Sequence, residues 1–268
     1  MFYGAVKQRF ATFALAGILA VAFRQTNIVW FVAGIVLYAH EMPGVAGIRW
    51  GRRMAPLAVV GVCVALAWTL IIWSQGGIAM TPQTRSEHMV GLRGVPNVEF
   101  AIGLGGLLFF PVLASTGPLI LRAMRSLRWA LLFVGIILLV GYSFKARHMY
   151  NIEPSLVEGF LRNRVIYAVT HTPLRWAFSF VVAVAIFAFG YVAFLPRASS
   201  FKLPLYAIGT IALLPVELIE QRYYLPLFAL FWIARAPVDP ALERSQLVLG
   251  LSLSVAVLTA IARLQVFI

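Results

Sequence analysis

Residues 55–73 read APLAVVGVCVALAWTLIIW, a run of nineteen positions without a charged side chain. A helix needs about 20 apolar residues to cross the hydrocarbon core of a bilayer, so this run predicts a membrane-spanning helix. The apolar residues do not alternate with polar ones, which favours helices over the strands of a membrane barrel. Further apolar runs lie at 10–23, 28–39, 98–121, 129–144, 174–195, 203–219, 225–234 and 246–262.

The composition of the whole chain agrees with this prediction. Hydrophobic residues make up 62% of the 268 positions and charged residues only 12%. One compact core in water could not bury that much apolar surface. We therefore expect an all-α fold, a polytopic transmembrane helix bundle of about 7–9 spans in a single domain over residues 1–268.

The apolar runs differ in length. Those that begin at 55, 98 and 174 are long enough to span, and those at 129, 203 and 246 come close with their flanking residues. The runs on either side of residues 24–27, and those on either side of residues 220–224, are too short singly. Each of these pairs is either two short helices that meet at a polar corner or one long helix that is broken near its middle. Membrane proteins build binding sites in both geometries.

The formal net charge is +13, from 22 Lys and Arg against 9 Asp and Glu. Basic residues that flank membrane spans account for such an excess, so we expect membrane lipid and no nucleic acid as a partner. The single cysteine, Cys63, excludes an intramolecular disulfide. No nucleotide-binding or zinc motif occurs, so neither a cofactor nor a metal is expected.

The distribution of Lys and Arg predicts the topology. If all nine runs cross, the loops with more basic residues include residues 49–53 and 122–128, and the positive-inside rule places them in the cytoplasm. The long loops 74–97 and 145–173 and both polar corners then share the non-cytoplasmic face, and such long polar loops often carry function. We expect the site on that face of an integral, multi-pass protein of a bacterial inner membrane or an endoplasmic reticulum membrane.

The first polar corner, RQTNIVW at residues 24–30, places a guanidinium, two amides and a hydroxyl between apolar runs. This arrangement is costly in hydrocarbon unless it lies at the interface or lines a wet cavity. Arg24 offers a planar fork of donors to phosphate oxygens, and Gln25 and Asn27 offer donors and acceptors to sugar hydroxyls. A hydrogen-bonded cluster between helices is the structural alternative.

The second polar corner, LIEQRYYLP at residues 218–226, combines Glu220, Arg222 and Tyr223. Tyrosine side chains often anchor helices at the membrane interface, and a Glu two residues from an Arg can simply neutralise it. By itself this corner would indicate a membrane anchor.

Together the two corners resemble the dolichyl-phosphate-glucose α-1,2-glucosyltransferases, membrane enzymes of the GT-C type that add the last glucose to the lipid-linked oligosaccharide. The resemblance rests on RQTNIVW and on the Glu-x-Arg-Tyr-Tyr stretch that precedes Pro226. Residues 161–167, LRNRVIY, are similar to the family's Asp-Asn-Arg-His-Tyr stretch and keep its Asn-Arg pair. Arg85, Ser86 and His88 fall where the family has a Gly-Asp-Lys-Ser-Ser-His loop.

The chain also departs from the family. Arg162 stands where the family has Asp before the Asn-Arg pair, and Gln83 and Thr84 replace the Gly-Asp of the loop. In the family the RQTN stretch lies near the middle of a chain almost twice as long, and acidic residues that include the expected base precede it. The resemblance therefore covers only the C-terminal half. It implies a fragment, a reduced homologue, or the second half of a split gene with a partner chain for the N-terminal half.

The resemblance implies an inverting, metal-independent transfer of a hexose from a polyprenyl-phosphate donor to a lipid-linked glycan acceptor, and the hexose of the family is glucose. Cationic side chains would stabilise the charge that grows on the leaving phosphate, and a carboxylate would deprotonate the acceptor hydroxyl. We expect Arg24, Arg222 and Arg164 at the phosphate and Glu220 or Glu87 as the base. The expected sugar or acceptor contacts are Gln25, Asn27, Trp30, His88, Asn163 and Tyr223.

Two other functions stay open. A transporter or flippase for a lipid-linked or amphipathic substrate would use the two broken helices as a mid-membrane site. A catalytically inactive membrane subunit would keep the family fold without its activity. An upstream reading frame with an acidic first loop would favour the transferase.

Overall fold

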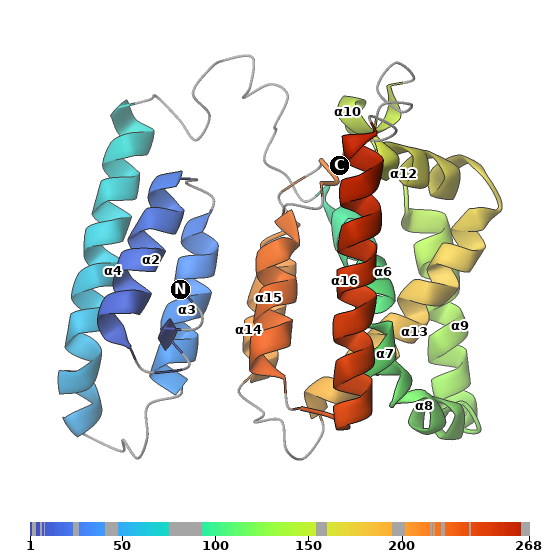
Figure 1. The fold of residues 1–268 in the computed structure, drawn as a ribbon, viewed down its shortest axis with the longest axis horizontal. Helices are drawn as coiled ribbons and strands as arrows, with labels where there is room; N and C mark the ends of the chain where they lie inside the picture. The colour runs from blue at the N-terminus through green and yellow to red at the C-terminus, as the bar shows by residue number, and fades with distance from the viewer. Residues whose placement is uncertain are drawn as a thin grey trace. The chain divides into compact units, whose positions relative to one another are not determined.

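The computed structural model describes residues 1, 4–5, 7, 9–23, 27–40, 48–74, 93–153, 160–194, 202–214, 216, 218–220, 223–235 and 237–263. The regular elements in these ranges are helices, and no strand occurs among them, so the all-α prediction is confirmed for this part of the chain. The chain divides into two compact units, both drawn in Figure 1. Unit 1 comprises Met1–Met89, Phe201–Ala212 and Ala229–Ala234, and unit 2 comprises Val90–Ser200, Leu213–Phe228 and Arg235–Ile268.

Three of the described helices are long and apolar enough to cross a membrane. They are α4 (Ile48–Ser74), α13 (Leu174–Phe194) and α16 (Pro240–Ala262). A fourth candidate is the pair formed by α8 (Gly117–Ala123) and α9 (Leu127–Ser143), which are bent by 110° at the break between them. The described residues thus contain three or four candidate spans, and the count of about 7–9 stays a prediction.

Unit 1 contains a helix hairpin made by α2 (Phe10–Phe23) and α3 (Ile28–His40). The ring of Phe13 stacks on Phe31 at 5.6 Å and lies 5.4 Å from Tyr38. A Cβ atom at Gly17 would lie 2.3 Å from the Phe31 ring, so only glycine allows the two helices to approach this closely. Of the two geometries expected around the first polar corner, the structure therefore has two short helices side by side.

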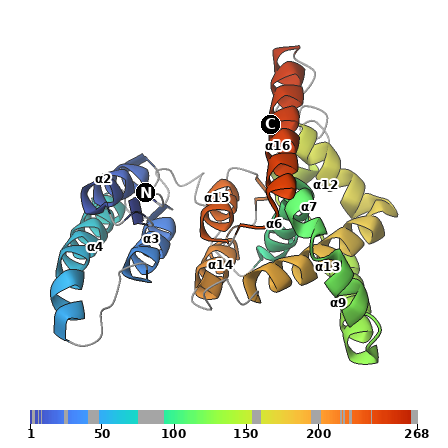
Figure 2. The ribbon, with the colours of Figure 1, turned by 60° about the horizontal axis from the view of Figure 1, so that its bottom comes forward.

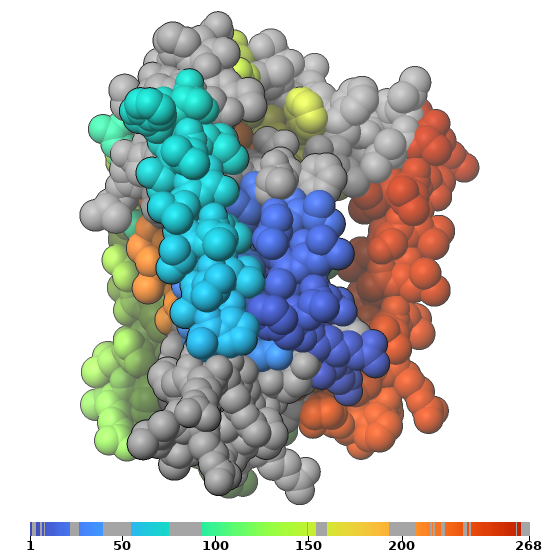
Figure 3. Space-filling view, turned by 90° about the vertical axis from the view of Figure 1, so that its left-hand side faces the viewer, coloured from blue at the N-terminus to red at the C-terminus, as the bar shows by residue number. Residues whose placement is uncertain are grey.

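Residues 55–74 of α4 in unit 1 are mostly exposed, on the face that Figure 3 shows. The exposed side chains recur at helical spacing, and Val59, Val62, Leu66, Leu70 and Trp73 are each more than half exposed. An apolar stripe of this length suits contact with lipid tails rather than with water. Unit 1 also contains α14 (Lys202–Ile211), which packs against α3.

Unit 2 is organised around α13, which packs along both α6 (Val95–Leu108) and α9, as Figure 2 shows. Two short helices, α10 (Met149–Ile152) and α12 (Leu161–His171), follow α9 along the chain. Helix α15 (Leu225–Ala234) begins in unit 2 and ends in unit 1. The core of unit 2 gathers apolar side chains from these segments, among them Phe100, Phe144, Ile166, Val182, Ile219 and Tyr224.

The run at 98–121, expected to form one continuous span, is instead divided among three helices. Helix α6 ends at Leu108, α7 covers Phe110–Ala114, and α8 begins at Gly117. Pro111 has no N–H to donate to the preceding turn, which explains the first break. At the second break the hydroxyls of Ser115 and Thr116 donate to the carbonyls of Val112 and Leu113, at 2.7 and 2.6 Å.

The first break is supported by a side chain from a distant helix. The Gln246 Nε2 of α16 donates to the carbonyl oxygen of Leu108 at 2.5 Å, and Gln246 is only 4% exposed. A carbonyl that loses its helical partner in apolar surroundings needs such a donor, because water cannot reach it. Gln246 therefore joins α16 to the point where α6 ends.

An ion pair fixes the start of α16. Arg235 donates from Nη1 and Nη2 to the two carboxylate oxygens of Glu243, both at 2.6 Å, and Glu243 also accepts the backbone N–H of Val238 at 3.0 Å. Asp239 accepts the N–H of Ala241 at 2.8 Å and caps the helix that begins at Pro240. This two-bond geometry between a guanidinium and a carboxylate is the strongest form of such a pair.

We expect Gln246→Leu to lower the free energy of unfolding by about 1–3 kcal/mol, because it leaves the Leu108 carbonyl buried without a donor at nearly constant side-chain volume. The measurement is thermal unfolding of the purified chain in detergent. Ser245→Ala, one residue earlier on the exposed side of α16, is the matched control. Equal unfolding temperatures for Gln246→Leu and the control would contradict the role assigned to Gln246.

Candidate functional site

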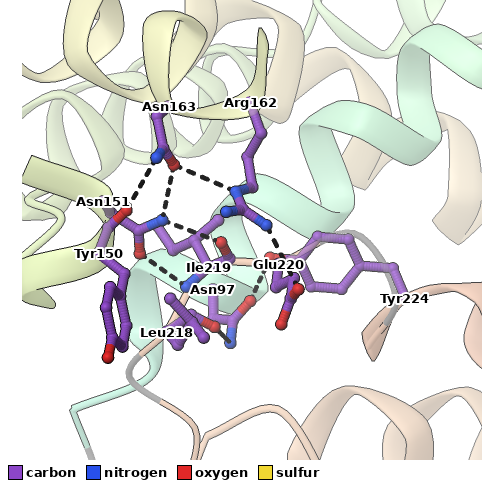
Figure 4. A network of polar contacts seen from close by, with 9 residues as sticks. All are labelled: Asn97, Tyr150, Asn151, Arg162, Asn163, Leu218, Ile219, Glu220 and Tyr224. Carbon is purple, nitrogen blue, oxygen red and sulfur yellow. Dashed lines mark hydrogen bonds and ion pairs between the residues drawn. The ribbon is translucent and has the colours of Figure 1, made fainter. Parts of the chain in front are cut away.

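The candidate site of unit 2 is a network of polar contacts around residues 216–224, which connect α14 to α15. Its members come from α6, α10, α12 and this connecting segment, and Figure 4 shows them together. We call this set the polar network: Asn97, Tyr150, Asn151, Arg162, Asn163, Leu218, Ile219, Glu220 and Tyr224.

Asn97 holds the start of the segment. Its Nδ2 donates to the carbonyl oxygens of Val216 and Leu218, both at 3.0 Å, and its Oδ1 accepts the hydroxyl of Tyr224. Asn97 is fully buried. Burial raises the pKa of the Tyr224 phenol, so this group stays protonated and keeps its role as a donor to Asn97.

Asn151 and Asn163 hold the middle of the segment. Asn151 accepts the N–H of Ile219 at 2.9 Å and donates to the carbonyl of the same residue at 3.1 Å, so its amide pairs with the backbone as a neighbouring strand would. Asn163 Oδ1 accepts a bond from Asn151 at 3.2 Å, and its Nδ2 donates to the carbonyl of Tyr150 at 2.8 Å. Both asparagines are fully buried. Their hydrogen bonds hold α10, α12 and the segment together.

Arg162 and Glu220 form the charged part of the network. Arg162 Nε donates to Asn163 Oδ1 at 3.1 Å, and its Nη1 lies 3.5 Å from Glu220 Oε1. The side chains of Arg162 and Glu220 are 10% and 15% exposed, so the pair is largely shielded from water. Removing one partner would take this ion pair away from the other charge in a place that is largely shielded from water.

Gly94 lets the segment approach α6. Its N–H donates to the carbonyl of Leu214 at 2.9 Å. A Cβ atom at this position would lie 2.4 to 2.5 Å from the carbonyl oxygens of Leu213, Leu214 and Val216. No larger residue fits without moving the backbone of the segment.

The structure brings some of the predicted site residues together. Asn163 and Glu220 both belong to the polar network, through Arg162. Tyr223 is half-buried beside it and donates its N–H to the carbonyl of Glu220 at 3.1 Å. Arg164 follows Asn163 on α12 and is exposed.

Two predicted residues belong to unit 1 and are placed by its own contacts. Asn27 donates from Nδ2 to the carbonyl of Ala20 at 2.8 Å and so satisfies the end of α2. Trp30 is 8% exposed within α3. The amide nitrogen of Asn27 is therefore engaged by the end of α2. The predicted residues Arg24, Gln25, Glu87, His88 and Arg222 lie outside the described residues.

Sequence reasoning missed four side chains of the network, which are Asn97, Asn151, Arg162 and Tyr224. Asn97 and Asn151 stand in stretches without a recognised motif, although an asparagine just after Pro96 at the edge of an apolar run is a polar group that needs a buried partner. Arg162 was seen only as a departure from the glucosyltransferase pattern. Its charge has a role in this chain, because it pairs with Glu220.

Comparison of the chain with protein-family models, with curated proteins and with solved structures finds no match. The resemblance to the glucosyltransferase family therefore rests on its sequence motifs. In the part of the chain that the structure describes, no three His, Cys, Asp or Glu side chains are grouped so that they could hold a metal ion.

We expect Gly94→Ala to lower the free energy of unfolding by about 2 kcal/mol or more, because the new methyl group overlaps three carbonyl oxygens. Thermal unfolding in detergent measures the effect. Gly135→Ala is the matched control, since nothing lies within 4 Å of its added Cβ and alanine favours the middle of α9. If Gly94→Ala unfolds at the wild-type temperature or above it, the close approach at Gly94 is wrong.

We expect Arg162→Gln and Glu220→Gln each to lower the free energy of unfolding by about 1–3 kcal/mol, because each leaves a shielded polar partner without its charge. The double variant should lose less than the sum of the two single losses, since it removes both charges together. Unfolding of all four proteins completes this double-mutant cycle. Strictly additive losses would show that the two side chains do not interact.

Proposed function

We propose that this chain is a multi-pass membrane glycosyltransferase, or the C-terminal half of one, that transfers a hexose from a polyprenyl-phosphate donor to a lipid-linked glycan. Glucose is the expected sugar. The observation that most directly supports this function is a contact between two of the four motifs. Arg162, in residues 161–167, pairs with Glu220, in residues 218–226. Motifs that are distant in sequence and share one site should meet in this way.

The buried and exposed parts of the network suggest different roles. Asn97, Asn151 and Asn163 are fully buried and bound to protein groups, so they position the backbone. Arg164 follows Asn163 directly, its side chain is exposed on α12, and we keep it as a proposed phosphate contact. Arg24 and Arg222 stay the other proposed phosphate contacts, with Glu220 or Glu87 as the proposed base. Fixed guanidinium groups can stabilise a leaving phosphate without a metal.

The charges at the opposite end of unit 2 support a non-cytoplasmic site. Arg122, Arg125 and Arg128 are all exposed where α8 meets α9. Helix α9 has 17 residues, or about 25 Å, and leads from these arginines toward α10 and α12 at the other end of unit 2, as Figure 1 shows. If the arginines face the cytoplasm by the positive-inside rule, the polar network faces away from it.

A transporter or flippase for a lipid-linked substrate is the second candidate. The observation that favours it is the broken course of α6, α7 and α8 with the 110° bend before α9, because interrupted helices build many transport sites. Reconstitution into vesicles with a fluorescent polyprenyl-phosphate sugar distinguishes the two functions. A transporter moves the lipid between leaflets without an acceptor, whereas a transferase releases polyprenyl phosphate only when the acceptor is present.

The direct test of the transferase is a transfer assay in detergent with polyprenyl-phosphate-glucose and a lipid-linked glycan. We expect Arg24→Ala and Arg164→Gln each to reduce turnover about a hundredfold, because each removes a charge that stabilises the transition state. Unfolding temperatures should stay at the wild-type value. Arg125→Gln, an exposed arginine at the far end of unit 2, is the control and should keep full turnover. Unchanged transfer by both site variants would remove these two arginines from the site.

A further inference from the structure

Helix α6 carries a second buried polar side chain that the proposed transferase does not use. Glu99 is 7% exposed, two residues after Asn97 in the same helix. Its Oε1 accepts the hydroxyl of Ser143, the last residue of α9, at 2.5 Å. The carboxyl group thus lies at the contact between α6 and α9. Helix α6 is shorter than the three candidate spans, and α9 is a candidate only together with α8.

The second carboxyl oxygen of Glu99 has no hydrogen-bond partner although it is buried. Asn97 provides the contrast, because its Nδ2 and its Oδ1 are both bonded. A buried charge is normally paired with a cation or with several donors, since an isolated carboxylate is strongly disfavoured in apolar surroundings. Glu99 has one donor.

The charged groups on the neighbouring helices do not supply that missing partner. Helix α13 carries Arg175 and Tyr191, α9 carries Arg128 and Tyr142, and α7 carries no titratable residue. None of them forms an ion pair with Glu99 among the described residues. Burial raises the pKa of the Glu99 carboxyl from its ordinary value of 4.5 to about 7, and the Ser143 hydroxyl opposes this rise in part.

We propose that Glu99 and Ser143 form a proton-binding site between α6 and α9. The proton comes from water and binds to Glu99 Oε2, because Oε1 already accepts the Ser143 hydroxyl. Binding neutralises the carboxylate, and release returns the proton to water and restores the buried charge. The site is distinct from the transfer chemistry and does not depend on it.

The pH dependence of stability follows from this site. Below about 4.5 the carboxyl is protonated in both the folded and the unfolded chain, so it contributes no pH dependence. Between about 4.5 and 7 the folded chain binds the proton more tightly, so the free energy of unfolding falls as the pH rises. Above about 7 the carboxylate is charged and buried, and the loss of stability is complete.

The test is the unfolding temperature of the full chain in detergent from pH 4.5 to 9, for wild type and Glu99→Gln. Glutamine resembles the neutral acid, so the two proteins should unfold at similar temperatures near pH 4.5. The variant should become the more stable one as the pH rises, with a constant advantage above about pH 8. A difference between the two proteins that is the same at every pH overturns the proposal.

Two further variants make the result specific. Glu153→Gln removes one exposed carboxylate and should keep the wild-type pH profile. Ser143→Ala keeps the carboxyl but removes the donor that favours its charged form, so the fall in unfolding temperature should begin at the same pH and continue to a higher pH than in the wild type. This variant decides the question if Glu99→Gln does not fold, and an unshifted profile then overturns the proposal. These readouts need no transfer activity, so failure of the proposed function leaves them intact.

Discussion

Residues 213–214, 216, 218–220 and 223–224 of unit 2 lie outside its α-helices, so their N–H and C=O groups need partners other than a regular helical ladder. Asn97 and Asn151 provide them directly, and Asn163 holds Asn151 in place from α12. Each amide combines a donor with an acceptor, so one side chain can bond both groups of a residue, as Asn151 does with Ile219. The positions of Glu220 and Tyr223 follow from this anchoring. The geometry of the candidate site therefore depends on amide groups that are themselves too buried to contact a substrate.

The helical class of the fold was predictable because composition and long apolar runs leave few alternatives in a membrane. The number of helices and the residues at which they begin and end were less predictable. Run length suggested one helix over 98–121, whereas Pro111 and the hydroxyls of Ser115 and Thr116 divide it. Those residues are visible in the sequence, but the prediction of one helix was based on the length and the average hydrophobicity of the whole run. The partner of the first break, Gln246, is more than a hundred residues away, and no local pattern indicates it.

For the site, the resemblance named both Asn163 and Glu220, but it did not predict how the two side chains are connected. The link is Arg162, at the position where the family pattern has the opposite charge. Asn97 and Glu99 lie two residues apart on α6, one with both its amide atoms bonded and the other with an oxygen that has no hydrogen-bond partner. Nothing in the spacing of α6 distinguishes them. The difference in their bonding comes from the neighbouring segments, because Asn97 meets backbone carbonyls and the Tyr224 hydroxyl whereas Glu99 meets only the Ser143 hydroxyl.

The pair of Arg235 and Glu243 has a consequence for how α16 enters the bilayer. Each charge alone would add about 2.5–3.5 kcal/mol to the insertion of a helix if it reached the membrane centre. Joined by two short bonds, they present no net charge and most of their hydrogen-bonding capacity is already used. If α16 spans the membrane, the pair leaves Arg244, which is exposed, as the one uncompensated charge in its first two turns.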